Sequence, residues 1–181
     1  MQKRKNESGI TLLVLAITIV VLLIIGGVTI ANGKKAIEFQ KYANLKEDIE
    51  KLTECIGSAY SLQENISEIG PKYMGNLDFL NGTMGKDNYD IKNPNDGPDY
   101  YVIGISNLNS ATKGKVSKLK YGKNNYNYSS SASYNSVQNT YSGNDVYIIN
   151  GVSHTIYYTD GIEYNGKTYY RLSEKYTLIN E

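Results

Sequence analysis

The sequence predicts an α+β protein in which a long N-terminal helix packs on an antiparallel β-meander. Two observations lead to this prediction. Apolar residues keep helical spacing after an uncharged N-terminal segment, and Asn-Gly and Asp-Gly dipeptides separate short β-prone runs near the C-terminus. The 181 residues leave room for one domain of ordinary size beyond the N-terminal segment.

The helix is predicted to begin as a transmembrane span. Residues 10–31 are 22 consecutive uncharged residues, ITLLVLAITIVVLLIIGGVTIA. They would form about 33 Å of helix, enough to cross a hydrocarbon core of about 30 Å. A cleaved secretory signal would have a shorter apolar run, whereas a signal anchor without processing is a second alternative. Basic Lys3, Arg4 and Lys5 favour an N-terminus inside the cell and a head outside.

Residues 32–64 are predicted to continue as an amphipathic helix. Apolar or aromatic residues recur at alternating spacings of 3 and 4, which places them on one side of a helix. These residues are Tyr42, Leu45, Ile49, Leu52, Ile56 and Ala59. The charged residues between them, Asp48 included, are assigned to the other faces. The soluble part of the chain is therefore expected to start with this helix.

Residues 65–181 are predicted to form a globular head that ends in antiparallel hairpins. The candidate strands are 100–106, 116–121, 146–149, 153–159, 162–164 and 167–172. Asn150-Gly151, Asp160-Gly161 and Asn165-Gly166 separate the last four, and such dipeptides are preferred in two-residue hairpin loops. Residues 121–144, rich in Tyr, Asn, Ser and Gly, are predicted to be a loop, with a Tyr-rich contact surface as the alternative.

The side chains argue against catalysis and nucleic-acid binding. His154 is the only histidine and lies in a predicted strand, so neither a zinc cluster nor a Ser-His pair is expected. Cys55 is the only cysteine, which excludes an intrachain disulfide. Subtracting the 3 basic and 1 acidic residues before Gly9 from 19 and 18 leaves 16 basic against 17 acidic residues, so no global field attracts nucleic acid.

One acidic loop is the candidate metal site. It offers oxygen donors of the kind that calcium prefers. Its spacing does not fit an EF-hand, and Asx turns around Pro94 and Pro98 explain the same residues without an ion. The residues concerned are Asp87, Asp90, Asn93, Asn95, Asp96 and Asp99. No other cofactor is expected.

The N-terminal residues resemble the type IV pilin and type II secretion pseudopilin family. A basic leader of residues 1–9 ends in Gly9 and is followed by Ile10 and an apolar run. The resemblance implies that a prepilin peptidase cuts after Gly9 and methylates the new amine of Ile10. Lys3, Arg4, Lys5, Thr11 and Leu12 would complete the processing motif.

One position departs from the family pattern, and it affects which kind of subunit is expected. Val14 stands at the fifth mature position, where the family commonly has a glutamate thought to pair with the N-terminal amine of a neighbouring subunit. The uncharged span inserts more easily but lacks this device for setting register. A minor or accessory subunit is therefore favoured.

The function that the resemblance implies is assembly. The subunit would stay in the cytoplasmic membrane until its helix packs with those of like or related subunits in a type IV pilus or type II secretion-like filament outside the cell. Thr18, Gly26 and Gly27 could allow close helix approach. The alternative is a permanently anchored surface protein whose Tyr-rich head binds a ligand. Processing after Gly9 would distinguish the two.

Overall fold

The computed structural model has an α+β fold with one long helix and a sheet that is mostly antiparallel. It describes residues 5–59, 66–77, 99–114, 116, 118–126 and 128–172, and for residues 5–13 and 24–32 it describes the backbone only. The chain divides into two compact units, Met1–Phe39 and Gln40–Glu181. We refer to the second unit as the head and describe each unit by itself.

Helix α1 (Lys5–Ala59) begins in the first unit and ends in the head. Within the head, its predicted apolar side faces the core: Leu45, Ile49, Leu52 and Ile56 are buried. Cys55 is buried in the same core. The spacing of 3 and 4 therefore predicted the packed side correctly. Asp48 is an exception, because it is completely buried although it was assigned to a polar face.

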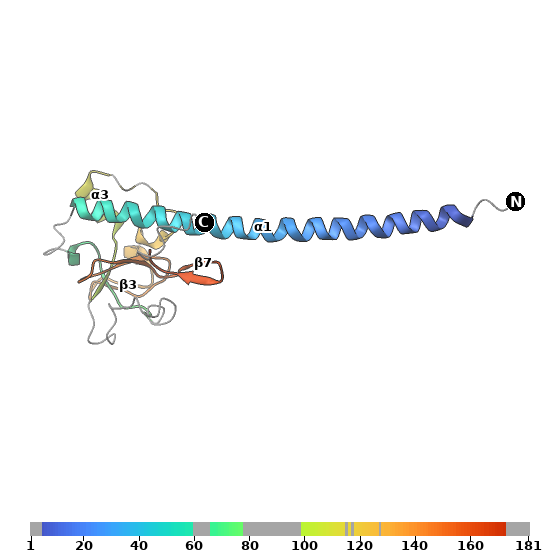
Figure 1. The fold of residues 1–181 in the computed structure, drawn as a ribbon. Coiled ribbons are helices and arrows are strands. Elements are labelled where there is room, and N and C mark those ends of the chain that lie inside the picture. The colour runs from blue at the N-terminus through green and yellow to red at the C-terminus, as the bar shows by residue number, and fades with distance from the viewer. Residues whose placement is uncertain are drawn as a thin grey trace. The chain divides into compact units, whose positions relative to one another are not determined.

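The head contains a six-stranded sheet in the order β3-β4-β1-β2-β5-β6. Strand β3, at one end of this order, is labelled in Figure 1. All neighbours pair antiparallel except β1 and β4, which are parallel, so the predicted simple meander is not observed. The strands are β1 (Lys72–Tyr73), β2 (Tyr100–Val102), β3 (Tyr134–Asn135), β4 (Thr140–Tyr141), β5 (Tyr147–Asn150) and β6 (Ile156–Tyr158). A separate hairpin pairs β7 (Ile162–Tyr164) with β8 (Lys167–Tyr169).

Four predicted strands are wrong in whole or in part. The runs 153–159 and 167–172 form strands only at Ile156–Tyr158 and Lys167–Tyr169. The run 100–106 stops pairing after Val102, and helix α3 (Ile105–Thr112) follows with Gly104 as its N-cap. Ile105, Leu108 and Thr112 are its buried residues, with the spacing of 3 and 4 that a helix requires. The run 116–121 forms no strand at its described positions, because α1 accepts backbone hydrogen bonds that a strand would use.

Only one of the three predicted two-residue hairpin loops is observed. Asn165 and Gly166 both have positive φ, and Tyr164 pairs with Lys167 around them. Asn150 instead belongs to β5 and accepts backbone hydrogen bonds from Val152 and Ser153, which lengthens the loop. His154 lies in this loop with φ of 58°, not in a strand. The Asp160-Gly161 dipeptide connects the two sheets.

Residues 121–144 are not the plain loop that was predicted. They contain β3, β4 and the 3-10 helices η2 (Lys123–Asn125) and η3 (Tyr128–Ser130); a further 3-10 helix, η1 (Ile66–Glu68), precedes β1. Asn125 is completely buried and ties the sheet together. Its side-chain amide donates to the carbonyls of Ile103 and Tyr147, both at 2.9 Å, and its Oδ1 accepts from the Tyr147 N–H at 2.7 Å.

Tyrosine supplies much of the head's core. Among the described residues seven tyrosine side chains are buried: Tyr73, Tyr100, Tyr141, Tyr147, Tyr157, Tyr158 and Tyr169. Several of these rings lie edge-on or tilted against one another, with centroids of Tyr147 and Tyr158 at 5.1 Å. These seven rings therefore serve packing and are not exposed for the ligand recognition that a Tyr-rich binding head would require.

Candidate functional site

The candidate functional site is the apolar segment, which we define as residues 14–23 of α1. All ten side chains are exposed, and only Thr18 among them is polar. Leu22 and Leu23 are 68% and 70% exposed, and Val21, the least exposed of the eight large apolar residues in the segment, reaches 45%. Exposure on ten consecutive residues covers the whole circumference of the helix, since 3.6 residues make one turn. This segment is therefore apolar on every side.

Such a segment is unfavourable in water. Burying one Val, Leu or Ile side chain contributes roughly 1.5–3 kcal/mol, and the apolar segment holds nine apolar residues. Its polar groups need no water, because the backbone is helical and the Thr18 hydroxyl donates to the Leu15 carbonyl at 2.8 Å. The segment is thus suited to apolar surroundings such as lipid or other apolar helices.

The structure places the predicted processing residues at the start of α1. Gly9, Ile10, Thr11 and Leu12 have helical backbone, as does Lys5, the first residue of the helix. Their side chains, like Lys3 and Arg4 as a whole, lie outside the described residues. Among the side chains that the structure describes, Val14 is the first exposed apolar one, at 52%.

The predicted span itself is only partly described. Of residues 10–31, only the backbone is described at 10–13 and at 24–31, a range that includes Gly26 and Gly27. In the part of the chain that the structure describes, no helix is both long and apolar enough to cross a membrane.

The candidate calcium loop is described at one position only. Asp87, Asp90 and Asp96 lie outside the described residues, as do Asn93 and Asn95. Asp99 is exposed, and its Oδ1 forms an ion pair with Lys72 Nζ at 2.6 Å. Within the described ranges no three acidic, histidine or cysteine side chains form a group that could hold a metal ion.

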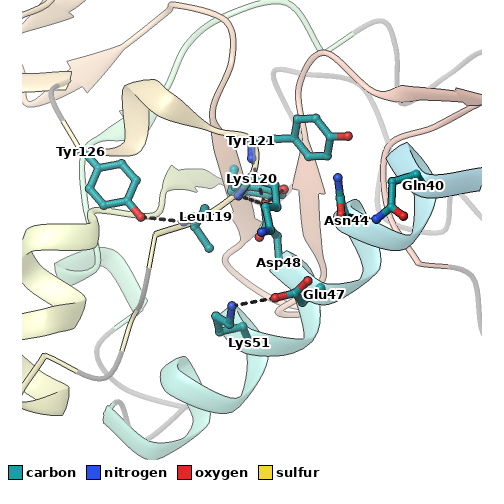
Figure 2. A network of polar contacts seen from close by, with 10 residues as sticks. Gln40, Asn44, Glu47, Asp48, Lys51, Leu119, Lys120, Tyr121 and Tyr126 are labelled. Carbon is teal, nitrogen blue, oxygen red and sulfur yellow. Dashed lines mark hydrogen bonds and ion pairs between the residues drawn. The ribbon is translucent and has the colours of Figure 1, made fainter. Parts of the chain in front are cut away.

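A second polar arrangement, centred on Asp48, joins α1 to the rest of the head (Figure 2). Asp48 Oδ2 accepts hydrogen bonds from the backbone N–H groups of Lys120 at 2.7 Å and Tyr121 at 2.9 Å, and from the Tyr147 hydroxyl at 2.9 Å. The Tyr121 hydroxyl in turn donates to the Lys41 carbonyl at 3.2 Å. One carboxylate thus holds residues 120–121 and β5 against the helix.

Burial changes the titration of this cluster. Desolvation raises the pKa of Asp48 above its ordinary value and outweighs its hydrogen bonds, which lower it. Desolvation also raises the pKa of Tyr147, with the Asp48 charge adding to the effect, and that of Tyr158, whose hydroxyl donates to Asp145 Oδ1 at 3.0 Å. The hydrogen-bond donors around Asp48 are backbone amides and a phenol that stays protonated. This arrangement is that of a structural contact within the head.

Alkali is expected to unfold the head as its buried tyrosines ionise. Burial raises the pKa of Tyr73 from 10.0 to about 12, and it raises those of Tyr147 and Tyr158 as well. A raised folded-state pKa means that the stabilisation is complete below pH 10 and is lost as the pH rises through the folded-state value. Tyrosinate absorbance and near-ultraviolet circular dichroism should therefore change together above pH 10. Full ionisation with unchanged dichroism would contradict this prediction.

The burial of Asp48 could have been predicted from its spacing to the apolar residues of the helix. Asp48 follows Leu45 by three residues and precedes Leu52 by four, so it belongs to the same helical side as the apolar residues. Its partners could not be found in this way, since Lys120 and Tyr147 lie 72 and 99 residues further along the chain.

The chain was compared with known protein families, with characterised proteins and with solved structures, and it matches none of them.

Proposed function

We propose that the chain is a pilin-like or pseudopilin-like structural subunit, processed after Gly9 and assembled into a type IV pilus or type II secretion-like filament, in the role of a minor subunit. The observation that carries this proposal is the apolar segment, whose ten side chains are all exposed on an uninterrupted helix. A helix that is apolar on every side belongs in lipid or among other apolar helices.

The apolar segment would lie in lipid first and among other apolar helices later. Before assembly, residues 10–31 hold the subunit in the cytoplasmic membrane with the head outside. On assembly, the same residues pack against those of like or related subunits. Such packing depends on van der Waals contact and small residues, because lipid is as apolar as the helix. The composition of residues 1–12, which resembles the processing motif of pilins, supports the same proposal.

Processing requires access to the Gly9–Ile10 peptide bond. This bond lies in helical backbone, four residues after the helix begins at Lys5. A peptidase would therefore act on a locally unwound helix end, where fraying is least costly. Glycine favours this unwinding, since it lowers helix stability by roughly 1 kcal/mol relative to alanine. The absence of a Cβ also allows close approach to the backbone.

Replacing Gly9 by alanine is expected to block processing. Gly9→Ala adds a Cβ at the bond to be cut and stabilises the helix there. The chain should be produced in cells with an active prepilin peptidase, and the N-terminal mass of the membrane-bound protein measured. Wild type should begin at a methylated Ile10, whereas Gly9→Ala should keep residues 1–9.

Gly33→Ala is the matched control. Gly33 lies in the same helix, and a Cβ at that position would meet no atom within 4 Å apart from the neighbouring backbone of the helix itself, so this variant should be processed normally. A wild-type chain that keeps residues 1–9 in the presence of the peptidase would contradict the proposed function.

A further inference from the structure

An exposed row of lysines lies on the head. From residue 100 to 144 the chain has five lysines and no acidic residue. Four of them are described and exposed, and we call them the lysine row: Lys113, Lys118, Lys120 and Lys123. Buried Val116 and Leu119 fix the backbone between them. None of the four forms an ion pair with another described residue.

An exposed acidic row lies on α1 of the same head. We define it as Glu47, Glu50 and Glu54, which are exposed. At 100° per residue these three positions lie opposite the buried side that contains Leu45 and Leu52. Their spacing of 3 and 4 places like charges next to one another, which destabilises a helix by a few tenths of a kcal/mol per pair.

The helix neutralises this acidic row only in part. Lys51 Nζ lies 3.2 Å from Glu47, and Lys46 Nζ lies 3.7 Å from Glu50. Both pairs are at least partly exposed to solvent, so each contributes little to stability. Glu54 forms no ion pair with any residue that the structure describes. The acidic row therefore keeps a net negative charge that an external cation can satisfy.

We propose that the lysine row of one subunit docks on the acidic row of a second copy of this chain. This inference rests on the proposed function and names the contact between heads. Each row repels itself in an isolated subunit, and mutual contact would relieve both repulsions. Because the two rows are different surfaces, the contact is heterologous and repeats from copy to copy, which builds a filament when the rotation between copies does not close into a ring.

A second copy fits the lysine row better than nucleic acid or lipid does, because the chain itself carries the complementary surface. Salt should weaken the contact, since exposed charges are screened within about 10 Å at 0.1 M ionic strength.

Cross-linking of the full chain tests this contact directly. A mixture of unlabelled and ¹⁵N-labelled protein from membranes, in mild detergent, is treated with a zero-length carbodiimide and analysed by mass spectrometry. We expect links of mixed isotope composition between the lysine row and the acidic row. The absence of such links would overturn the inference. The N-terminal mass of the same sample tests processing after Gly9 separately.

Charge reversal provides the second test. Lys118→Glu with Lys120→Glu, and Glu50→Lys with Glu54→Lys, should each reduce pelletable assemblies roughly tenfold, because like charges then face each other. Mixing the two variants should restore assembly, since each then supplies the charge that the other needs. Lys167→Glu with Glu163→Lys, on exposed positions of the β7–β8 hairpin, is the control and should assemble normally.

A different partner would give a different pattern. If reversal of the lysine row left assembly unchanged and instead abolished binding to phosphatidylserine vesicles or to DNA, the proposed contact would be wrong. Failure of the mixed variants to assemble would also overturn it.

Discussion

Asp48→Ala is expected to destabilise the head by about 3 kcal/mol, one of the largest effects of any single substitution in it. The carboxylate accepts three hydrogen bonds on Oδ2, and its removal leaves the Lys120 and Tyr121 N–H groups and the Tyr147 hydroxyl without their acceptor. Each buried donor without a partner costs about 1–3 kcal/mol. The loss of a desolvated charge offsets part of this cost.

Urea unfolding of the full chain in mild detergent, followed by near-ultraviolet circular dichroism of the tyrosines, measures the effect. Glu47→Ala is the matched control, because Glu47 is the residue immediately before Asp48 and forms only a partly exposed pair with Lys51. It should change the free energy of unfolding by less than about 0.5 kcal/mol. Equal effects of the two substitutions would show that Asp48 does not hold the head together.

Asp48→Asn separates the charge of this residue from its hydrogen bonding. The amide oxygen can still accept hydrogen bonds, so this variant should be more stable than Asp48→Ala. Burial raises the folded-state pKa of Asp48 above 3.8, so folding favours the protonated carboxyl group. The resulting contribution to the free energy of unfolding is complete below pH 3.8 and is lost as the pH rises through the folded-state pKa. The stability of wild type relative to Asp48→Asn should therefore fall from pH 3.8 upward. A constant difference would contradict the raised pKa.

Local patterns predicted the elements that short-range rules determine. The 3 and 4 spacing identified the buried side of α1, and Asn165-Gly166 identified the one two-residue loop, since both of its residues adopt positive φ. Strand β7 was predicted at its observed residues, 162–164. In each of these cases the neighbours in sequence are also the neighbours in space.

The errors arose where distant residues decide the structure. Residues 116–121 look like a strand, but Asp48 on α1 takes two of the N–H groups that a strand would donate to its neighbour. Asn150-Gly151 looks like a two-residue loop, but Asn150 pairs with Tyr100 on β2 and remains in the sheet. The parallel pairing of β1 with β4 likewise depends on chain segments about 70 residues apart. No local spacing contains this information.

Val20→Lys is expected to prevent membrane retention and assembly. Residue 20 lies near the middle of residues 10–31, and a lysine at the centre of a membrane helix costs about 3 kcal/mol on insertion scales. Membrane and filament fractions should be compared by immunoblotting. Val137→Lys is the control, because Val137 is 94% exposed in the head and lies outside the apolar segment. Normal recovery of Val20→Lys in both fractions would contradict the role proposed for this segment.

The position of the lysine distinguishes a membrane span from a helix that is merely covered by another protein. Val14 lies six residues before Val20, about 9 Å nearer the end of residues 10–31. In a bilayer, the ammonium group of Val14→Lys could reach the polar interface, so it should be tolerated much better than Val20→Lys. On a protein surface the cost would follow local packing instead. Because both side chains are about half exposed, at 52% and 54%, equal losses of membrane retention would argue against a span and leave helix packing as the reason for the apolar segment.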